Sequence, residues 1–272
     1  MRLMMSRLSG RRALPALSAA ALSLLLATCI FAPGKFTSQL DVRKDRSFAF
    51  RYTGDILMVP LMESTTKDEF QPETCYNDDS FDERECTAEE ITKQKEEWEK
   101  SREERKKSDA QAAQMFLGGI DPSKPDAGRQ IAEKLRRQTG WKKVEYVGNG
   151  RFDVDFAIAG RLDHDFTFPT FEGMPMANAF VQVSLRQDGS VRVDAPSFGP
   201  ANNSGTMAGM AKDADDASSK LIDGTFAIHT DAEILANNTD EGPAAATAGQ
   251  MLTWRINPLT PAAPTALLKL RP

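Results

Sequence analysis

Apolar and polar residues alternate along two neighbouring stretches near the beginning of the chain. The alternating apolar positions are Phe36, Leu40 and Val42, followed by Phe48, Phe50 and Tyr52. A short polar break at residues 44–46 separates the two stretches. Alternation of this kind places every second side chain on one face of a strand. The pattern therefore predicts a β-hairpin with one buried face.

From Thr87 the pattern changes to that of a charged helix reaching about Asp109. Thr87 and Glu90 have the spacing of a capping box, which is typical of a helix beginning. Acidic residues precede lysines by four positions at Glu89/Lys93, Glu96/Lys100 and Glu103/Lys107, the favourable order for such pairs. A helix this polar lies across the surface or projects from it. Two interpretations stay open, a solvated surface helix and an arm that docks on a partner.

The second half of the chain is mostly strand by the same criterion. One alternating run covers residues 152–158, and its parity continues through Leu162, His164, Phe166 and Phe168. Another run at 181–185 leads through Gln187-Asp188-Gly189 to Val191 and Val193, which predicts a second hairpin.

The expected fold class is α+β, with a one-sided antiparallel sheet and a central helical insertion at about 87–139 that contains the long, highly charged helix. We expect a single domain over residues 36–272. Residues 199–220 are rich in Gly, Ala, Asn, Asp and Ser without apolar periodicity, and they predict a mobile loop.

Residues 1–28 have the pattern of an export signal. Four arginines precede a short apolar run from Ala13 to Ala27, which is too short to cross a bilayer. The following Leu26-Ala27-Thr28-Cys29 resembles the lipobox of bacterial lipoproteins. The resemblance implies that Cys29 becomes the acylated (palmitate-bearing) N-terminus, with residues 29–35 as a tether. The alternative is a plain secretory signal cut nearby.

An anchored protein of this kind belongs on the periplasmic side of the cell envelope. Ile30 follows Cys29 where the inner-membrane retention signal of enteric bacteria has Asp, which favours the outer membrane.

Without the signal the chain has 30 basic and 39 acidic residues, a net charge of −9. An acidic balance of this size argues against a nucleic-acid partner and against electrostatic attraction of the whole protein to anionic lipid. Two cysteines remain, Cys75 and Cys86, in one polar stretch. In an exported protein such a pair predicts a structural disulfide rather than a redox pair, which would have Cys-x-x-Cys spacing.

The ending of the chain is similar to that of LppM-type envelope lipoproteins. The residues that carry the resemblance are Gly224-Thr-Phe-Ala-Ile-His-Thr, Ile234-Leu-Ala-Asn-Asn, Leu252-Thr-Trp-Arg-Ile and Ala266-Leu-Leu, together with the hairpin at 36–53. The resemblance implies an anchored envelope domain that contacts lipid or glycolipid. It implies no catalytic residues.

Candidate catalytic chemistry is sparse. Ser64-Thr-Thr-Lys67 matches the Ser-x-x-Lys of penicillin-recognising acyl enzymes, but their Ser-x-Asn and Lys-Thr-Gly companions are missing. His164 shares the apolar parity if its strand is unbroken, which predicts a partly buried, hydrogen-bonded histidine. The presence of only two histidines, without paired thiolates, argues against a metal site, and no motif indicates a cofactor.

One aromatic set is a candidate lining for a lipid cavity, with an ordinary hydrophobic core as the alternative. Its members are Phe48, Phe50, Tyr52, Phe156, Phe166 and Phe168. We therefore expect a membrane-anchored, non-enzymatic envelope lipoprotein that binds or scaffolds, with lipid, glycolipid or a protein as partner. The alternative is an envelope hydrolase that uses Ser64 and Lys67, or His164.

Overall fold

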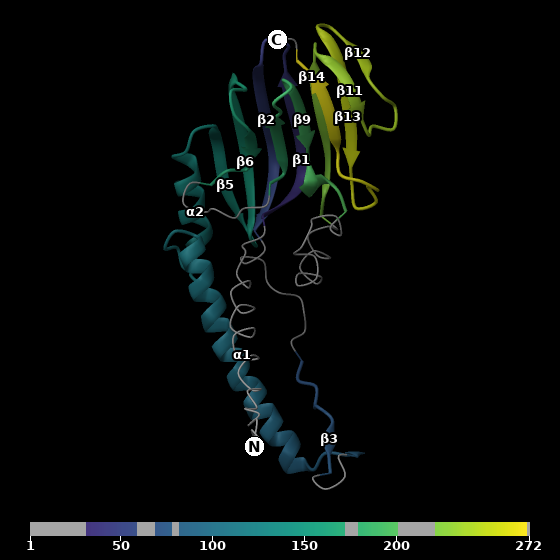
Figure 1. Ribbon diagram of the computed structural model, residues 1–272. Helices are drawn as coiled ribbons and strands as arrows, with labels where there is room; N and C mark the ends of the chain where they lie inside the picture. The colour runs from purple at the N-terminus through teal and green to yellow at the C-terminus, as the bar shows by residue number, and fades with distance from the viewer. Residues whose placement is uncertain (1–30, 59–68, 78–81, 172–178, 201–220, 271–272) are drawn as a thin grey trace, which may run out of the picture.

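The computed structural model describes residues 31–58, 69–77, 82–171, 179–200 and 221–270. These residues form fourteen strands in three sheets, together with two α-helices and a short 3-10 helix, η2 (Pro196–Phe198). Figure 1 shows a β domain from which one long helix extends. Cys29, Ser64 and Lys67 lie outside the described residues, as does the predicted mobile loop from residue 201 onward.

The largest sheet has seven strands. In spatial order they are β12 (Ala244–Ala246), β13 (Gly249–Ile256), β10 (Asp223–Thr230), β1 (Phe31–Val42), β2 (Ser47–Met58), β6 (Arg151–Arg161) and β5 (Trp141–Gly148). Neighbouring strands are antiparallel except β1 and β10, which run parallel. The predicted first hairpin is present as β1 and β2. It begins earlier than expected, because β1 includes residues 31–35 of the predicted tether.

A second sheet faces the inner side of the first. Its order is β11 (Glu233–Asn237), β14 (Thr265–Lys269), β9 (Ser190–Asp194), β8 (Val181–Leu185) and β7 (Phe166–Phe168). Strands β8 and β9 are the second predicted hairpin, in which Asp188 accepts hydrogen bonds from the backbone and hydroxyl of Ser190. A third sheet contains only β3 (Cys75–Tyr76) and β4 (Glu83–Arg84).

The predicted fold class is wrong. The described chain is mostly β, and a second sheet covers the large sheet where we expected the helical insertion to cover it. Alternation identifies the buried face of a strand but does not say which element covers that face. The alternation that continues from 152 to 168 therefore spans two sheets, because the chain leaves β6 at Arg161 and enters the other sheet as β7 at Phe166.

The core between the sheets is aromatic. Phe168 of β7 has ring-centroid distances of 4.9 Å to Phe50, 5.1 Å to Tyr52 and 4.7 Å to Phe156 of the large sheet. Burial of apolar rings is the main contribution to the stability of such a sandwich. Burial raises the pKa of the Tyr52 hydroxyl well above its usual range, and this hydroxyl donates to the backbone carbonyl of Asp55.

Two helices complete the fold. Helix α2 (Ala127–Arg136) packs its apolar face, including Ile131 and Leu135, into the same core beside β5. Gly128 approaches the ring of Tyr146 so closely that a Cβ would lie 2.5 Å from it. Helix α1 (Ala88–Phe116) corresponds to the predicted charged helix and is longer than expected. Among the described residues, no helix is both long and apolar enough to span a bilayer.

Candidate functional site: a disulfide-closed helical arm

Helix α1 forms an arm that extends away from the β domain, with the small β3–β4 hairpin near its far end (Figure 1). Its 29 residues correspond to about 43 Å at the rise of an α-helix. At the base of the arm Leu117 is fully buried in the core. Gly118 and Gly119 follow with positive φ angles and close the helix through bonds to the carbonyls of Met115 and Gln114.

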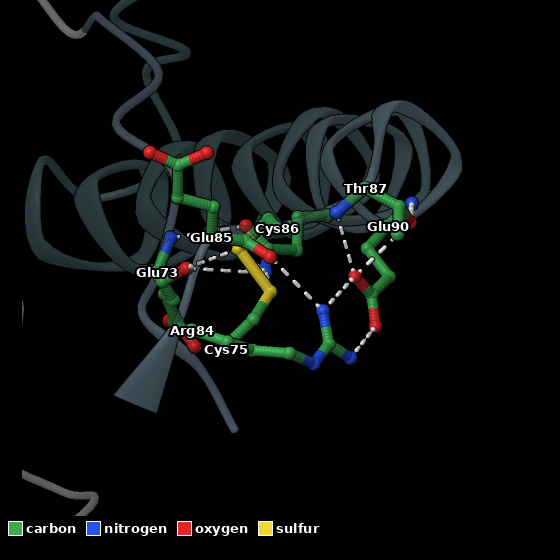
Figure 2. Close-up of a disulfide and its surroundings, with 8 residues drawn as sticks. Glu73, Cys75, Arg84, Glu85, Cys86, Thr87 and Glu90 are labelled. Carbon is green, nitrogen blue, oxygen red and sulfur yellow. Dashed lines mark hydrogen bonds and ion pairs between the residues drawn. A yellow bond between two sulfur atoms is a disulfide. The ribbon is translucent and has the colours of Figure 1, made fainter. Parts of the chain in front are cut away.

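The tip of the arm is closed by a disulfide between Cys75 and Cys86 (Figure 2). The predicted disulfide is thus confirmed. Cys75 lies on β3 opposite Arg84 of β4, and Cys86 directly precedes the first turn of α1. The bond therefore fixes the hairpin to the beginning of the helix.

A capping box starts α1, as the sequence predicts. The Thr87 amide donates to Glu90 Oε2 at 2.8 Å, and the Glu90 amide donates to Thr87 Oγ1 at 3.3 Å. Arg84 reaches across from the hairpin and donates to both Glu90 oxygens, at 2.8 and 2.6 Å (Figure 2). Hydrogen bonds from Arg84, and then from Thr87, lower the pKa of Glu90 to about 2.

An extended segment, residues 69–76, lies along the first half of α1. The Glu73 amide donates to Gln94 Oε1 at 3.0 Å, and Gln94 Nε2 donates back to the Glu73 carbonyl at 3.3 Å. Farther along, the rings of Phe70 and Trp98 meet edge to face at 5.9 Å. The guanidinium of Arg102 lies 5.1 Å from the Trp98 ring centroid, within cation–π range. Segment and helix therefore form one two-layered arm.

Charge is unevenly distributed along this arm. Residues 69–90 contain nine acidic residues against the single Arg84. That stretch alone accounts for almost the whole net charge of −9 of the chain without its signal. A surface of this kind attracts a basic partner surface and repels a polyanion.

The other predicted site residues lie in the β domain. Phe50, Tyr52, Phe156 and Phe168 are buried, while Phe48 and Phe166 pack partly buried against them. Their rings contact one another, with Phe48 and Phe50 both within 5.3 Å of Phe166. His164 is exposed on the bend between β6 and β7, so the prediction of a partly buried histidine is wrong.

A polar cluster that sequence reasoning missed surrounds His229. Its Nδ1 lies 3.0 Å from Asp41 Oδ1 and 3.2 Å from Arg43 Nη2, and Arg43 Nη1 donates to the Ala248 carbonyl at 2.8 Å. The parallel pairing of β1 with β10 brings Asp41 opposite His229, although the two residues are 188 positions apart in the sequence. Local pattern carries no signal for such a pair. These bonds tie β1 to β10, and no described hydroxyl or thiol forms a hydrogen bond with this histidine.

An open groove of about 800 Å³ lies nearby, where the chain passes from β10 to β11. Lys44 and Lys269 contribute positive charge to it, and Asp231 and Glu233 contribute negative charge. The mixture of charges defines no single ligand class. Within the described ranges, no three His, Cys, Asp or Glu side chains converge in a way that could hold a metal ion.

No protein-family model and no curated protein matches the chain. Among solved structures, it is similar to the NMR structure of the folded domain of LppM from Mycobacterium tuberculosis, with 12% sequence identity. The match covers 91% of this chain and 95% of that one, with a TM-score of 0.31. At that score the likeness does not establish a common fold.

Proposed function

We propose that this protein is a membrane-anchored lipoprotein of the cell envelope that acts as a scaffold without enzymatic activity. The arm extends from the β domain and is the element that contacts a protein partner. The observation that carries this proposal is the disulfide-closed arm, which reaches about 43 Å and has its tip ordered by its own contacts.

The anchoring part of the proposal rests on the sequence. The signal-like residues 1–28 and the lipobox-like Leu26-Ala27-Thr28-Cys29 support acylation of Cys29. The Cys75–Cys86 bond adds support, because disulfides persist in oxidising compartments such as the periplasm. Attachment to the outer membrane remains the favoured location on the basis of Ile30.

Scaffolding is favoured over lipid carriage inside the domain. The aromatic residues considered as a lipid lining contact one another across the two sheets, as expected of a filled core. Contact with lipid or glycolipid would then occur on the outer surface. No contact among the described residues favours the alternative hydrolase.

The arm offers a defined binding surface. Because the disulfide, the Arg84–Glu90 pair and the Gln94 contacts order its tip before any partner arrives, binding there loses little conformational entropy. The acidic excess of residues 69–90 favours a partner with a basic surface.

Site-specific photo-cross-linking in the native envelope tests this function. A photoreactive amino acid replaces Tyr76 at the tip, which is 49% exposed, and in a control strain it replaces Leu259 of the β domain, which is 89% exposed. We expect a discrete cross-linked protein from Tyr76, absent from Leu259 and lost when Cys75→Ser and Cys86→Ser open the tip. Equal cross-linking at both positions, or none at the tip, would count against the arm as the contact element.

A further inference from the structure

We propose that the open face of the seven-stranded sheet is the surface that meets the membrane, with a cradle for lipid headgroup phosphate at the end where β1 begins. This inference rests on the proposed anchoring at Cys29 and adds the orientation of the protein on the bilayer. The elements that cover the sheet pack on its inner side, through apolar residues such as Phe168, Ile131 and Phe198. The outward positions carry mostly polar and small residues, with Val147 and Met251 as exposed apolar side chains.

Strand register assembles the cradle from four strands, the hairpin β1–β2 and the two strands β10 and β13, which come much later in the sequence. Arg255 of β13 lies opposite Thr225 of β10, Thr225 lies beside Thr37 of β1, and Thr37 lies opposite Thr53 of β2. The resulting row has three small hydroxyl residues in the middle. Lys35 precedes Thr37 by two positions and so shares its face.

A shallow depression of about 400 Å³ follows from this arrangement, because short threonines lie between the long side chains of Lys35 and Arg255. Asp223 lies at its rim, beside Lys35. Two cations and three hydroxyls against one carboxylate suit a phosphate oxyanion, which accepts hydrogen bonds and charge from several donors at once.

The cations on this face are available for a ligand. No ion pair joins Lys35, Arg255 or the neighbouring exposed Arg51 to another residue in the described part of the chain. Toward the margins of the face the acidic residues have partners, since Asp153 pairs with Lys143 and Asp41 with His229. Asp155, at the far end of the threonine row, and Asp55, two residues after Thr53, add two further carboxylates.

The position of the cradle relative to the anchor points to the occupant. Strand β1 begins at Phe31, so at most about 7 Å of chain separates it from Cys29. Lys35 lies four residues farther, about 13 Å along the strand. Acyl chains on Cys29 would therefore hold the cradle within reach of the headgroup layer of the same membrane.

The arm excludes an orientation in which the strands stand upright on the membrane with the arm pointing into it. The β1–β2 turn lies at the end of the sheets near the C-terminus, and the arm extends from the opposite end, at which β1 begins (Figure 1). Charged residues surround α1, so it does not enter the hydrocarbon core of a bilayer anchored at that end. Turning the open sheet face toward the bilayer lays the strands and the arm along the membrane surface.

Fluorescence quenching on the lipidated mature protein tests this orientation in nanodiscs of phosphatidylethanolamine and phosphatidylglycerol. A fluorophore is attached to Thr253→Cys on the open face of the large sheet or to Gln182→Cys on the outward face of β8, both exposed positions. The quencher is a nitroxide on the lipid headgroup. We expect markedly stronger quenching at position 253 than at 182.

Charge variants test the role of the cations. The triple variant Lys35→Gln, Arg51→Gln, Arg255→Gln should lower quenching at position 253 to the level at 182. A control with the same change in charge, Arg129→Gln and Arg136→Gln on α2 together with Arg137→Gln directly after it, should keep the difference. Equal quenching at the two positions in the parent protein, or a difference that survives the first triple variant, would overturn the inference. A protein that does not associate with the nanodiscs at all would instead refute the anchor, and with it both proposals.

Discussion

Opening the disulfide should loosen the tip of the arm while leaving the β domain as stable as before. The perturbation is the double substitution Cys75→Ser and Cys86→Ser. The tip depends on this bond because its β3–β4 sheet has only two residues in each strand. A hairpin of that length is not stable alone in water. The β domain has its own aromatic core, to which neither cysteine belongs.

The magnitude follows from the length of the closed loop. The cysteines are separated by 11 positions, and the chain-entropy relation gives about 3 kcal/mol for a loop of that size. A free-energy change of this size corresponds to about a 100-fold change in an opening equilibrium. Amide hydrogens in residues 75–77, 82–84 and the first turn of α1 should therefore exchange up to about 100-fold faster.

Hydrogen-exchange mass spectrometry measures this effect, with peptides from β2 as the internal reference. Chemical reduction of the unsubstituted protein serves as the matched control, since it opens the same bond without adding serine hydroxyls. Unchanged exchange at the tip would refute the view that the disulfide orders it. A parallel loss of protection in β2 would refute the independence of arm and domain.

Three other substitutions give distinct outcomes. Phe168→Ala removes a fully buried ring from the filled core and should lower the free energy of unfolding by about 3–5 kcal/mol in urea titration; tolerance of it would indicate a preformed cavity. Gly54→Ala should cost about 1–3 kcal/mol in the same titration, because φ is +136° and a Cβ would lie 2.1 Å from the Lys35 carbonyl oxygen. Hydrogen bonds from Arg84 lower the pKa of Glu90 from 4.5 to about 2. The ionised Glu90 carboxylate therefore stabilises the first turn of α1 fully above pH 4.5, and this stabilisation is lost as the pH falls toward 2. Exchange at the first turn, corrected for intrinsic rates, should rise over that range in the parent protein and stay flat in Glu90→Gln.

Features encoded over short distances in the sequence were predicted correctly. The β8–β9 hairpin follows from alternation plus Asp188 and Gly189 at the turn, where Gly189 has a φ of 76°. The capping box and the disulfide likewise depend on residues that are close in sequence, three and 11 positions apart.

Features that depend on distant partners were not predicted. The alternation of apolar residues continues unchanged through residues 162–165, although the chain changes sheets there. Periodicity shows which side chains are buried, but it does not show which strands pair. The phosphate cradle needs the parallel pairing of Thr37 with Thr225, which joins the first strand to one nearly two hundred residues later. The contacts of Gln94 with Glu73 depend on an extended segment that has no apolar pattern of its own.

Mass spectrometry of the mature N-terminus tests the central proposal of an anchored envelope lipoprotein most directly. The account predicts that the purified membrane form begins at Cys29 and that its first peptide carries a diacylglyceryl group and an amide-linked acyl chain. A mature protein in which residue 29 is absent, or present as an unmodified thiol, would contradict the account.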